Sequence, residues 1–287
     1  WHPDGWLLTD LGYHDVGASG VVHAVAGFFT LGVLINLGAR RGKFIDGVAQ
    51  TISPHSLPMT LIGLMMIIFG FFGFLGGCII FNGGETGWTT IYNNPTNLSA
   101  FAFNTLMGFA GGVIGCYIAS RDPFWTMSGG LVGIISVAAA LDMYDPGLAF
   151  IIATCMGVLA VKFAKFLENR GIDDAVGAVA VHGFTGFVAV ILVGVFLGGT
   201  PNVGDVPPIS FVGQLIGAVV MAVTGFLPGY VISLVLKSLG ALRVPDTAED
   251  LGLDEVELIA KPYPEANTPA SVASEVPNKL ANTEPAL

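Results

Sequence analysis

His23 and His182 stand in nearly the same short phrase, VHAVAGF and VHGFTGF, and both phrases lie inside long apolar stretches. A histidine in hydrocarbon is rare and marks a functional site by default. Neutral imidazole carries one donor and one acceptor, so two facing rings can share a proton and still offer polar atoms to a small guest. In each phrase a glycine, Gly27 or Gly186, follows the histidine by four residues on the same helix face. The repeat therefore predicts one site built from two halves, with room for a partner helix or a narrow pore.

The preferred guest of such a site is small and neutral. Burial and like-charge repulsion both disfavour the protonation of two adjacent rings, so a neutral polar molecule suits the pair better than a cation. The alternative interpretation is two unrelated histidines that make ordinary interhelical hydrogen bonds. The repeated context favours the single site.

The composition indicates the solvent in which these phrases lie. The chain of 287 residues is 53% hydrophobic and 11% charged, with a mean hydropathy of +0.74, whereas soluble domains average about 25% charged residues. Its 40 glycines favour closely packed membrane helices. We expect an all-α polytopic membrane protein with no nucleic-acid partner. The net charge of -10 indicates little about binding, because the acids lie mostly in loops and near the C-terminal end. Cys78, Cys116 and Cys155 have no paired spacing, so packing is expected and neither a metal site nor a cofactor.

Apolar runs long enough to cross a bilayer predict seven transmembrane helices. They cover roughly residues 17–38, 58–81, 98–119, 125–142, 146–164, 177–198 and 209–236. All 11 lysines and arginines follow the first, third, fifth or seventh span. By the positive-inside rule the chain is N-out and C-in, with the basic loops on the cytoplasmic, stromal or matrix side of a plasma membrane or an organellar inner membrane.

This topology places the two histidines at similar depth in antiparallel helices. His23 lies eight residues after Asp15 in a descending helix, and His182 lies eight residues after Asp174 in an ascending one. At about 1.5 Å per residue, each is about 12 Å from its interface in a core of about 30 Å. Inverted repeats commonly place a substrate site near the bilayer midplane, and this is where we expect the histidine pair.

Four motifs in order resemble the signatures of the ammonium transporter family, which comprises Amt, Mep and Rh proteins. They are DVGASGVVH at 15–23, SPHSLPM at 53–59, GFLGG at 73–77, and DD at 173–174 leading to AVHG at 180–183. The resemblance runs from Trp1 to about Arg243. It implies an ammonium-transporter-like helical bundle, a homotrimer with one narrow hydrophobic pore per subunit, and passage of ammonia or ammonium past twin histidines, here His23 and His182. It implies a transporter and no enzyme.

The resemblance also implies roles for residues around the histidine pair. Phe74 matches an aromatic gate, with core packing as the alternative, and Trp1 matches a tryptophan of the outer vestibule. Cys78 stands in that vestibule where a serine is usual. Asp15 matches an acidic residue before the first histidine helix, and we expect it to cap that helix.

Two further positions depart from the family pattern. Leu75 stands where asparagine is frequent, and Gly177 stands where an aspartate commonly precedes the second histidine. With Cys78, each replacement removes a hydrogen-bonding group, because a thiol donates only weakly. Recruitment of a cation at the outer mouth is therefore expected to be weaker, while conduction of neutral ammonia is compatible with the intact histidines.

The chain divides into a membrane domain over 1–243 and a tail over 244–287. Family transporters usually have eleven spans in two inverted repeats plus a last helix, and this chain begins with Trp1 at what corresponds to the fifth. We therefore expect an incomplete inverted repeat in a processed, split or truncated chain. A partner chain that supplies the missing helices, or another protein of a larger membrane complex, is expected to cover the open face, because the bilayer does not tolerate exposed polar groups. The tail is expected to be partly extended or disordered.

Two classes of function fit a chain of this kind. The first is a split or truncated ammonium transporter. The alternative is a non-conducting, ammonium-transporter-like structural subunit of a larger complex. A third class, a seven-helix receptor or retinal protein, is suggested by the N-out topology but does not fit, because the last span has no lysine at mid-membrane depth, Lys237 being at its inner end, and the repeated histidine phrase has no role there.

Overall fold

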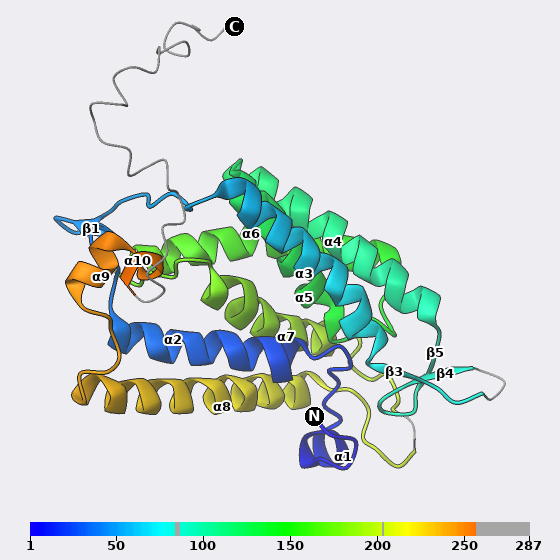
Figure 1. Cartoon of the computed structure of the whole chain (residues 1–287). Coiled ribbons are helices and arrows are strands. Elements are labelled where there is room, and N and C mark those ends of the chain that lie inside the picture. Colours follow the sequence, from blue (N-terminus) through cyan, green and yellow to red (C-terminus); the bar gives the residue numbers. More distant parts are fainter. Residues whose placement is uncertain (84–86, 203, 257–287) are drawn as a thin grey trace, which may run out of the picture. The chain divides into compact units, whose positions relative to one another are not determined.

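Helices dominate the computed structural model, which describes residues 1–83, 87–202 and 204–256 (Figure 1). The segments at the seven expected spans are η1–α2 (Ser19–Ala24 and Val25–Leu37), α3 (Leu57–Gly76), α4 (Leu98–Ser120), α5 (Pro123–Ala138), α6 (Pro146–Glu168), η2–α7 (Val179–Phe184 and Thr185–Phe196) and α8 (Phe211–Ser238). Six of them are long and apolar enough to cross a membrane, whereas α5 has only 16 residues. The chain is thus an integral, multi-pass helical membrane protein, and its orientation stays a prediction.

Five of these helices begin at a polar residue whose side chain accepts a backbone N–H bond of the first turn. Four of the cap and amide pairs, at 2.7–2.9 Å, are Asn97 with Ala100, Asp122 with Trp125, Asp145 with Gly147, and Ser210 with Gly213, and the fifth is Ser56 with Met59 at 3.5 Å. Prolines follow directly after Asp122 and Asp145. Because the first helical position has no intrahelical acceptor for its N–H group, proline is favoured there. These local signals separate α4, α5 and α6 and explain why α5 is short.

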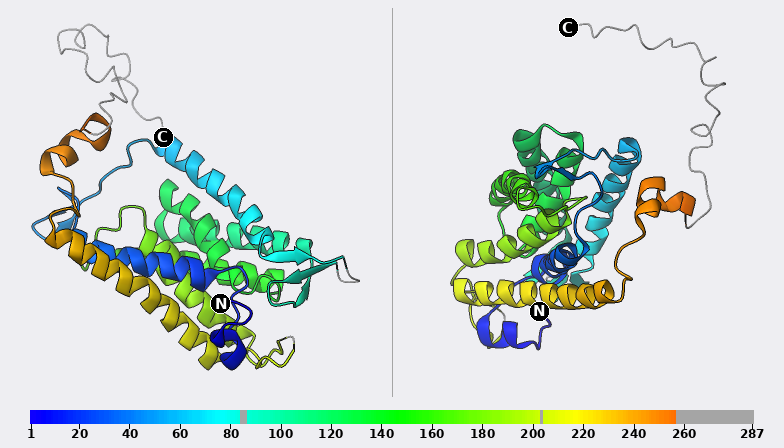
Figure 2. Two further views of the ribbon diagram at one scale, coloured as in Figure 1. Left: turned by 60° about the horizontal axis from the view of Figure 1, so that its bottom comes forward. Right: turned by 90° about the vertical axis from the view of Figure 1, so that its left-hand side faces the viewer.

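Glycines set the closest helix crossings. A Cβ atom added to Gly112 of α4 would lie 2.0 Å from the Gly129 carbonyl oxygen of α5. A Cβ atom on Gly225 of α8 would lie 2.2 Å from the Val25 carbonyl oxygen of α2. Figures 1 and 2 show α8 running alongside α2 over most of its length. Without side chains at these points the backbones come into direct contact. Close van der Waals packing of this kind stabilises helix association in membranes, where the hydrophobic effect does not drive it.

The connections carry the remaining elements of the first unit. Helix α1 (Trp6–Leu11) precedes η1, and β1 (Phe44–Ile45) pairs antiparallel with β2 (Val48–Ala49) between α2 and α3. Between α3 and α4, β3 (Ile79–Phe81), β4 (Trp88–Thr90) and β5 (Pro95–Thr96) form a three-stranded antiparallel sheet. These short strands were not expected from the sequence. They lie in connections, outside the helices of the bundle.

One side of α3 carries large apolar side chains that the described residues leave exposed. Those more than half exposed are Met59, Ile62, Met65, Met66, Ile67 and Phe69. A continuous apolar surface of this kind marks contact with lipid or with another protein surface. Helix α3 therefore has one face on the bundle and one face toward the membrane or a partner.

The chain separates into two compact units, Trp1–Leu242 and Arg243–Leu287. The second unit begins with α9 (Asp246–Leu251) and α10 (Leu253–Val256), and within it the Arg243 guanidinium lies 2.7 Å from a Glu249 carboxylate oxygen. Two short helices therefore begin the tail, which we expected to be partly extended or disordered. The rest of the predicted extended tail, from residue 257, lies outside the described residues.

Candidate functional site

The two histidine rings meet between η1 and η2. Their Nδ1 atoms are 3.1 Å apart, and the rings are stacked with centroids 5.2 Å apart and planes 18° apart. His23 is buried and His182 is half-buried. The structure thus brings together the two residues that the repeated phrase singled out, although they are 159 positions apart in the chain.

The contact between two Nδ1 atoms constrains the protons of the pair. One Nδ1 donates to the other, so in the neutral pair one ring keeps its proton on Nδ1 and the other on Nε2. The two Nε2 atoms then differ, because one is a free acceptor and the other an N–H donor. The Nε2 atom of His23 is buried and has no hydrogen-bond partner among the described residues. The pair can therefore accept a hydrogen bond from a small guest on one ring and donate one from the other.

The backbone around each histidine is built in the same way. Asp15 accepts the backbone N–H groups of Gly20 and Val21 on one carboxylate oxygen, both at 3.0 Å. Asp174 accepts those of Ala178 and Val179, both at 2.8 Å. Burial raises the pKa of both carboxyls, and the backbone donors oppose that shift. Each acid thus accepts hydrogen bonds from otherwise unpaired backbone N–H groups at the start of a π-helical turn that carries a histidine.

This arrangement refines the expectation for Asp15 and adds a second acid, Asp174. Asp15 does cap the first histidine helix, but from three residues before the N-cap position, which is Ala18 in a left-handed conformation with φ 65°. Gly177 has φ 72°, which glycine adopts without strain. Asp174 serves the second histidine helix as Asp15 serves the first. Its signal was present in the sequence, since it precedes His182 by the same eight residues as Asp15 precedes His23.

Glycines allow the histidine turns to approach. A Cβ atom on Gly27 would lie 2.0 Å from the Gly183 backbone nitrogen, and one on Gly186 would lie 2.2 Å from the Ser19 carbonyl oxygen. Gly27 and Gly186 therefore leave room for the partner backbone, which was one of the two roles expected of them. Gly183 takes part in the same crossing although it has no counterpart in the first phrase.

Two phenylalanines of α3 contact His23. Phe71 is buried and stacks on the His23 ring with centroids 5.6 Å apart and planes 25° apart. Phe74 meets the same ring edge-on at 6.2 Å and is 40% exposed. The sequence singled out Phe74 and missed Phe71, which lies three residues earlier and so on the same face of the helix. The gate role of Phe74 remains a prediction.

The remaining predicted residues lie near Asp15. The Trp1 indole nitrogen donates to the Asp15 carbonyl oxygen at 2.6 Å. The Cys78 thiol is buried and lies 3.6 Å from the Phe74 carbonyl oxygen, one turn back along the chain. Its weak donor is therefore directed at backbone, and the vestibule roles of Trp1 and Cys78 stay predictions.

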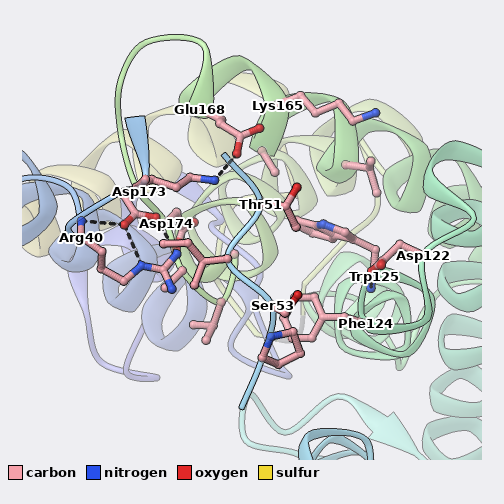
Figure 3. Close-up of a pocket in the computed structure, with 18 of the residues that line it drawn as sticks. Arg40, Thr51, Ser53, Asp122, Phe124, Trp125, Lys165, Glu168, Asp173 and Asp174 are labelled. Carbon is pink, nitrogen blue, oxygen red and sulfur yellow. Dashed lines mark hydrogen bonds and ion pairs between the residues drawn. The ribbon is translucent and has the colours of Figure 1, made fainter. Parts of the chain in front are cut away.

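A cavity of about 710 Å³ opens at the end of the bundle where η2 begins (Figure 3). Asp174 and Gly177 line it, and the Trp125 ring lies against Gly177. Figure 3 also shows the ion pair between Arg40 and Asp173, with both nitrogen to oxygen contacts at 2.8 Å. The loop that caps the His182 helix thus forms part of the cavity wall and is held to the end of α2 through Arg40.

We expect Arg40→Ala to lower the free energy of unfolding by about 1 to 3 kcal/mol, because the buried Asp173 carboxylate loses both guanidinium donors and keeps only the Arg40 backbone N–H bond at 2.9 Å. Burial alone would raise the pKa of Asp173, but the Arg40 hydrogen bonds and charge lower it. The stabilisation is therefore present at neutral pH and is lost as the pH falls through the carboxyl range.

The test is thermal unfolding followed by tryptophan fluorescence at pH 7 and near pH 3, with the exposed Lys162→Ala as the matched loss of positive charge. Equal melting of the Arg40→Ala and Lys162→Ala variants at pH 7 would contradict the prediction.

Comparison with known proteins identifies the family. The model of the Ammonium Transporter Family matches residues 1–263. The chain belongs to the ammonium transporter family. Ammonium transporter Amt2 of Methanocaldococcus jannaschii is 33% identical over 262 residues, which are 91% of this chain and 59% of that protein. Ammonium transporter Amt2 of Archaeoglobus fulgidus is 31% identical over 91% of this chain and 59% of its own length.

Solved structures agree with this assignment. A "Sensor Amt Protein" is 28% identical with a TM-score of 0.74, covering 88% of this chain and 62% of its own. Candida albicans Mep2, at 22% identity and a TM-score of 0.65 over 84% of this chain and 54% of its own, shares the fold. This ammonium transporter family chain therefore spans about three fifths of the length of the relatives that it matches.

Proposed function

We propose that this chain conducts ammonia, which reaches it as ammonium, through a narrow apolar path. The central binding site of this path is the pair His23 and His182. The observation that supports it best is the 3.1 Å contact between the two Nδ1 atoms, since a pair that shares one proton offers both a donor and an acceptor to ammonia. The relatives named ammonium transporters support the choice of guest.

The wall of this path includes α3, and we propose that it is completed by further protein. Phe74 is 40% exposed although its ring contacts His23, and His182 is only half-buried. A polar ring at membrane depth needs protein around it. A further segment, a partner chain or the neighbouring subunits of a homotrimer would each supply that cover against the exposed face of α3.

A second candidate function is a non-conducting structural subunit of a larger membrane complex. It is favoured by Cys78, whose weak donor is directed at the Phe74 carbonyl, so that the proposed outer mouth has less to offer a cation. The histidine pair has no evident purpose in that function, which is why we place conduction first.

The two functions differ in the response of sealed vesicles to ammonium. Ammonia that enters takes up a proton inside, so a trapped pH indicator reports its arrival as alkalinisation. We expect vesicles that contain the native assembly to alkalinise faster after an ammonium jump than empty vesicles. Equal rates for native assembly and empty vesicles would assign the chain to the structural function.

A further inference from the structure

Helices α4 and α6 run side by side in the same direction. A Cβ atom added to Gly111 of α4 would lie 2.5 Å from the Phe150 carbonyl oxygen of α6, and one added to Gly115 would lie 2.1 Å from the Thr154 carbonyl oxygen. The second contact lies four residues after the first on both helices, which requires the helices to be parallel. The C-terminal ends of α4 and α6 therefore face the same side of the membrane.

Four basic side chains gather at these two helix ends. All four are exposed, and they are Arg121 directly after α4 and Lys162, Lys165 and Arg170 in and after the last two turns of α6. In the described part of the chain none of the four forms an ion pair with an acidic side chain. The acids beside them in the chain are engaged with other groups, Glu168 with Lys43 and Asp122 with the Trp125 backbone N–H group.

The charge balance at these helix ends favours an anionic guest. Each helix C-terminus carries about half a negative charge from its unpaired carbonyl groups, and Asp122 adds one carboxylate, whereas the ion pair of Lys43 and Glu168 is neutral as a unit. The four basic side chains exceed that negative charge. The register of the glycine contacts places Arg121 within about one turn of the level of Lys162, so the two side chains are at the right depth to bind one anionic group together.

Each of the two arginines stacks on an aromatic ring one turn earlier in the chain. Arg121 Cζ lies 4.8 Å from the centre of the Tyr117 ring, and Arg121 Nη1 donates to the Tyr117 hydroxyl at 3.3 Å. Arg170 Cζ lies 4.8 Å from the centre of the Phe166 ring. Stacking orients the plane of a guanidinium and leaves N–H groups on its edge, where they bind phosphate oxygens in bidentate fashion. Both helix ends thus present an oriented phosphate ligand.

Exposed apolar side chains continue from these basic groups along each helix. They are 43% to 59% exposed, and they are Ile114, Tyr117 and Ile118 on α4 and Ile151, Leu159 and Phe166 on α6. On each helix they recur at three, four, seven or eight residues, which places them on one face. An exposed apolar face directly beside a basic end matches a molecule with an anionic head and apolar chains.

We propose that the ends of α4 and α6 bind an anionic phospholipid, with its phosphate at Arg121 and Lys162 and its acyl chains along the exposed faces of the two helices. Basic groups between transmembrane helices on the cytoplasmic or matrix side commonly bind anionic head groups, and the predicted orientation places these helix ends on that side. A soluble phosphate compound would match the charges and leave the apolar faces uncovered. A partner helix would cover the faces and leave the charges unmatched. The site does not depend on conduction through the histidine pair.

The test is thermal unfolding of the purified native assembly in a neutral detergent, followed by tryptophan fluorescence as lipid is added. Dioleoyl phosphatidylglycerol is the anionic lipid, dioleoyl phosphatidylcholine has the same chains and no net charge, and glycerol phosphate supplies the head group without chains. A ligand that binds only the folded state raises the melting temperature as its site fills. We expect phosphatidylglycerol to half-saturate at a concentration at least about fivefold lower than phosphatidylcholine. Arg121→Gln and Arg170→Gln should each raise its half-saturating concentration about fivefold, the effect of one basic residue at an anionic surface.

Lys237→Gln is the matched control. It removes the same charge from the last turn of α8, and Figures 1 and 2 show α8 on the far side of the bundle from α4. We expect Lys237→Gln to respond to phosphatidylglycerol as the native protein does, and His182→Ala to keep that response even if conduction fails.

Three results would overturn the proposal. Equal half-saturation by the two lipids would contradict recognition of the head group. Arginine variants that respond as the native protein does, or a loss in Lys237→Gln as large as theirs, would contradict the position of the site. A full shift with glycerol phosphate alone would assign the basic groups to a soluble phosphate compound.

Discussion

Vesicles that contain His23→Ala, His182→Ala or the double variant should all lose protein-dependent ammonia entry to about the same extent. We expect a loss of at least about tenfold in each, equivalent to about 1.4 kcal/mol in the barrier. The reason is the 3.1 Å contact between the Nδ1 atoms. Removing either ring leaves the other without the hydrogen-bond partner that determines which ring nitrogen carries the proton. Each single variant therefore already destroys the shared site.

The double variant distinguishes one site from two. Residues that act as a unit show strongly non-additive losses of rate. Two independent sites would instead give fold losses in the rate of ammonia entry that multiply. The measurement is the rate of indicator alkalinisation at equal protein content. Phe163→Leu is a control, because Phe163 of α6 stacks on Phe184, whereas the described ring contacts of the histidines are with Phe71, Phe74 and each other. A double variant about a hundredfold slower, with each single variant tenfold slower, would contradict a single shared site.

Gly27→Ala should destabilise the chain by about 3 kcal/mol or more, although it adds a single methyl group. The new Cβ atom would lie 2.0 Å from the Gly183 backbone nitrogen and 2.2 Å from its Cα atom. Overpacking typically costs about 1 to 3 kcal/mol, and backbone on both sides of this contact leaves no flexible side chain to move aside. Separation of η1 and η2 would also part the histidine rings.

Gly63→Ala of α3 is the matched control, because a Cβ atom there meets nothing within 4 Å. That change should be neutral or stabilising by about 1 kcal/mol or less, as expected for removal of a helical glycine. Both variants are compared by thermal unfolding in the same detergent and by the folded yield from membranes. Similar melting temperatures for Gly27→Ala and Gly63→Ala would contradict a glycine-dependent crossing.

Much of this site could be predicted because its parts are repeated in the sequence. The phrase around His23 recurs around His182, and two half-sites that must face each other impose the same local residues on both helices. Gly27 and Gly186 follow for the same reason, since the crossing tolerates no side chain at either point. The family could be recognised from four short motifs, and the model that matches residues 1–263 confirms it.

Other parts depend on rotations and distances that a linear pattern does not encode. Phe71 stacks on His23 because of the rotation of α3 about its own axis, and nothing in a run of phenylalanines distinguishes it from Phe74. Cys155 was expected to be a packing residue but is exposed, because the face of α6 that carries it has no described neighbour. His14 and Asp142 lie 128 positions apart in the chain, and only the fold brings the His14 Nε2 atom within 3.1 Å of an Asp142 oxygen.

The most direct test of the proposed site is the initial rate of labelled methylammonium uptake into vesicles, measured for the native assembly and for His182→Ala. We expect saturable uptake by the native assembly that is well above that of empty vesicles, and uptake at least about tenfold slower for His182→Ala. Equal rates for the native assembly and His182→Ala, or no native uptake above empty vesicles, would contradict conduction through the histidine pair.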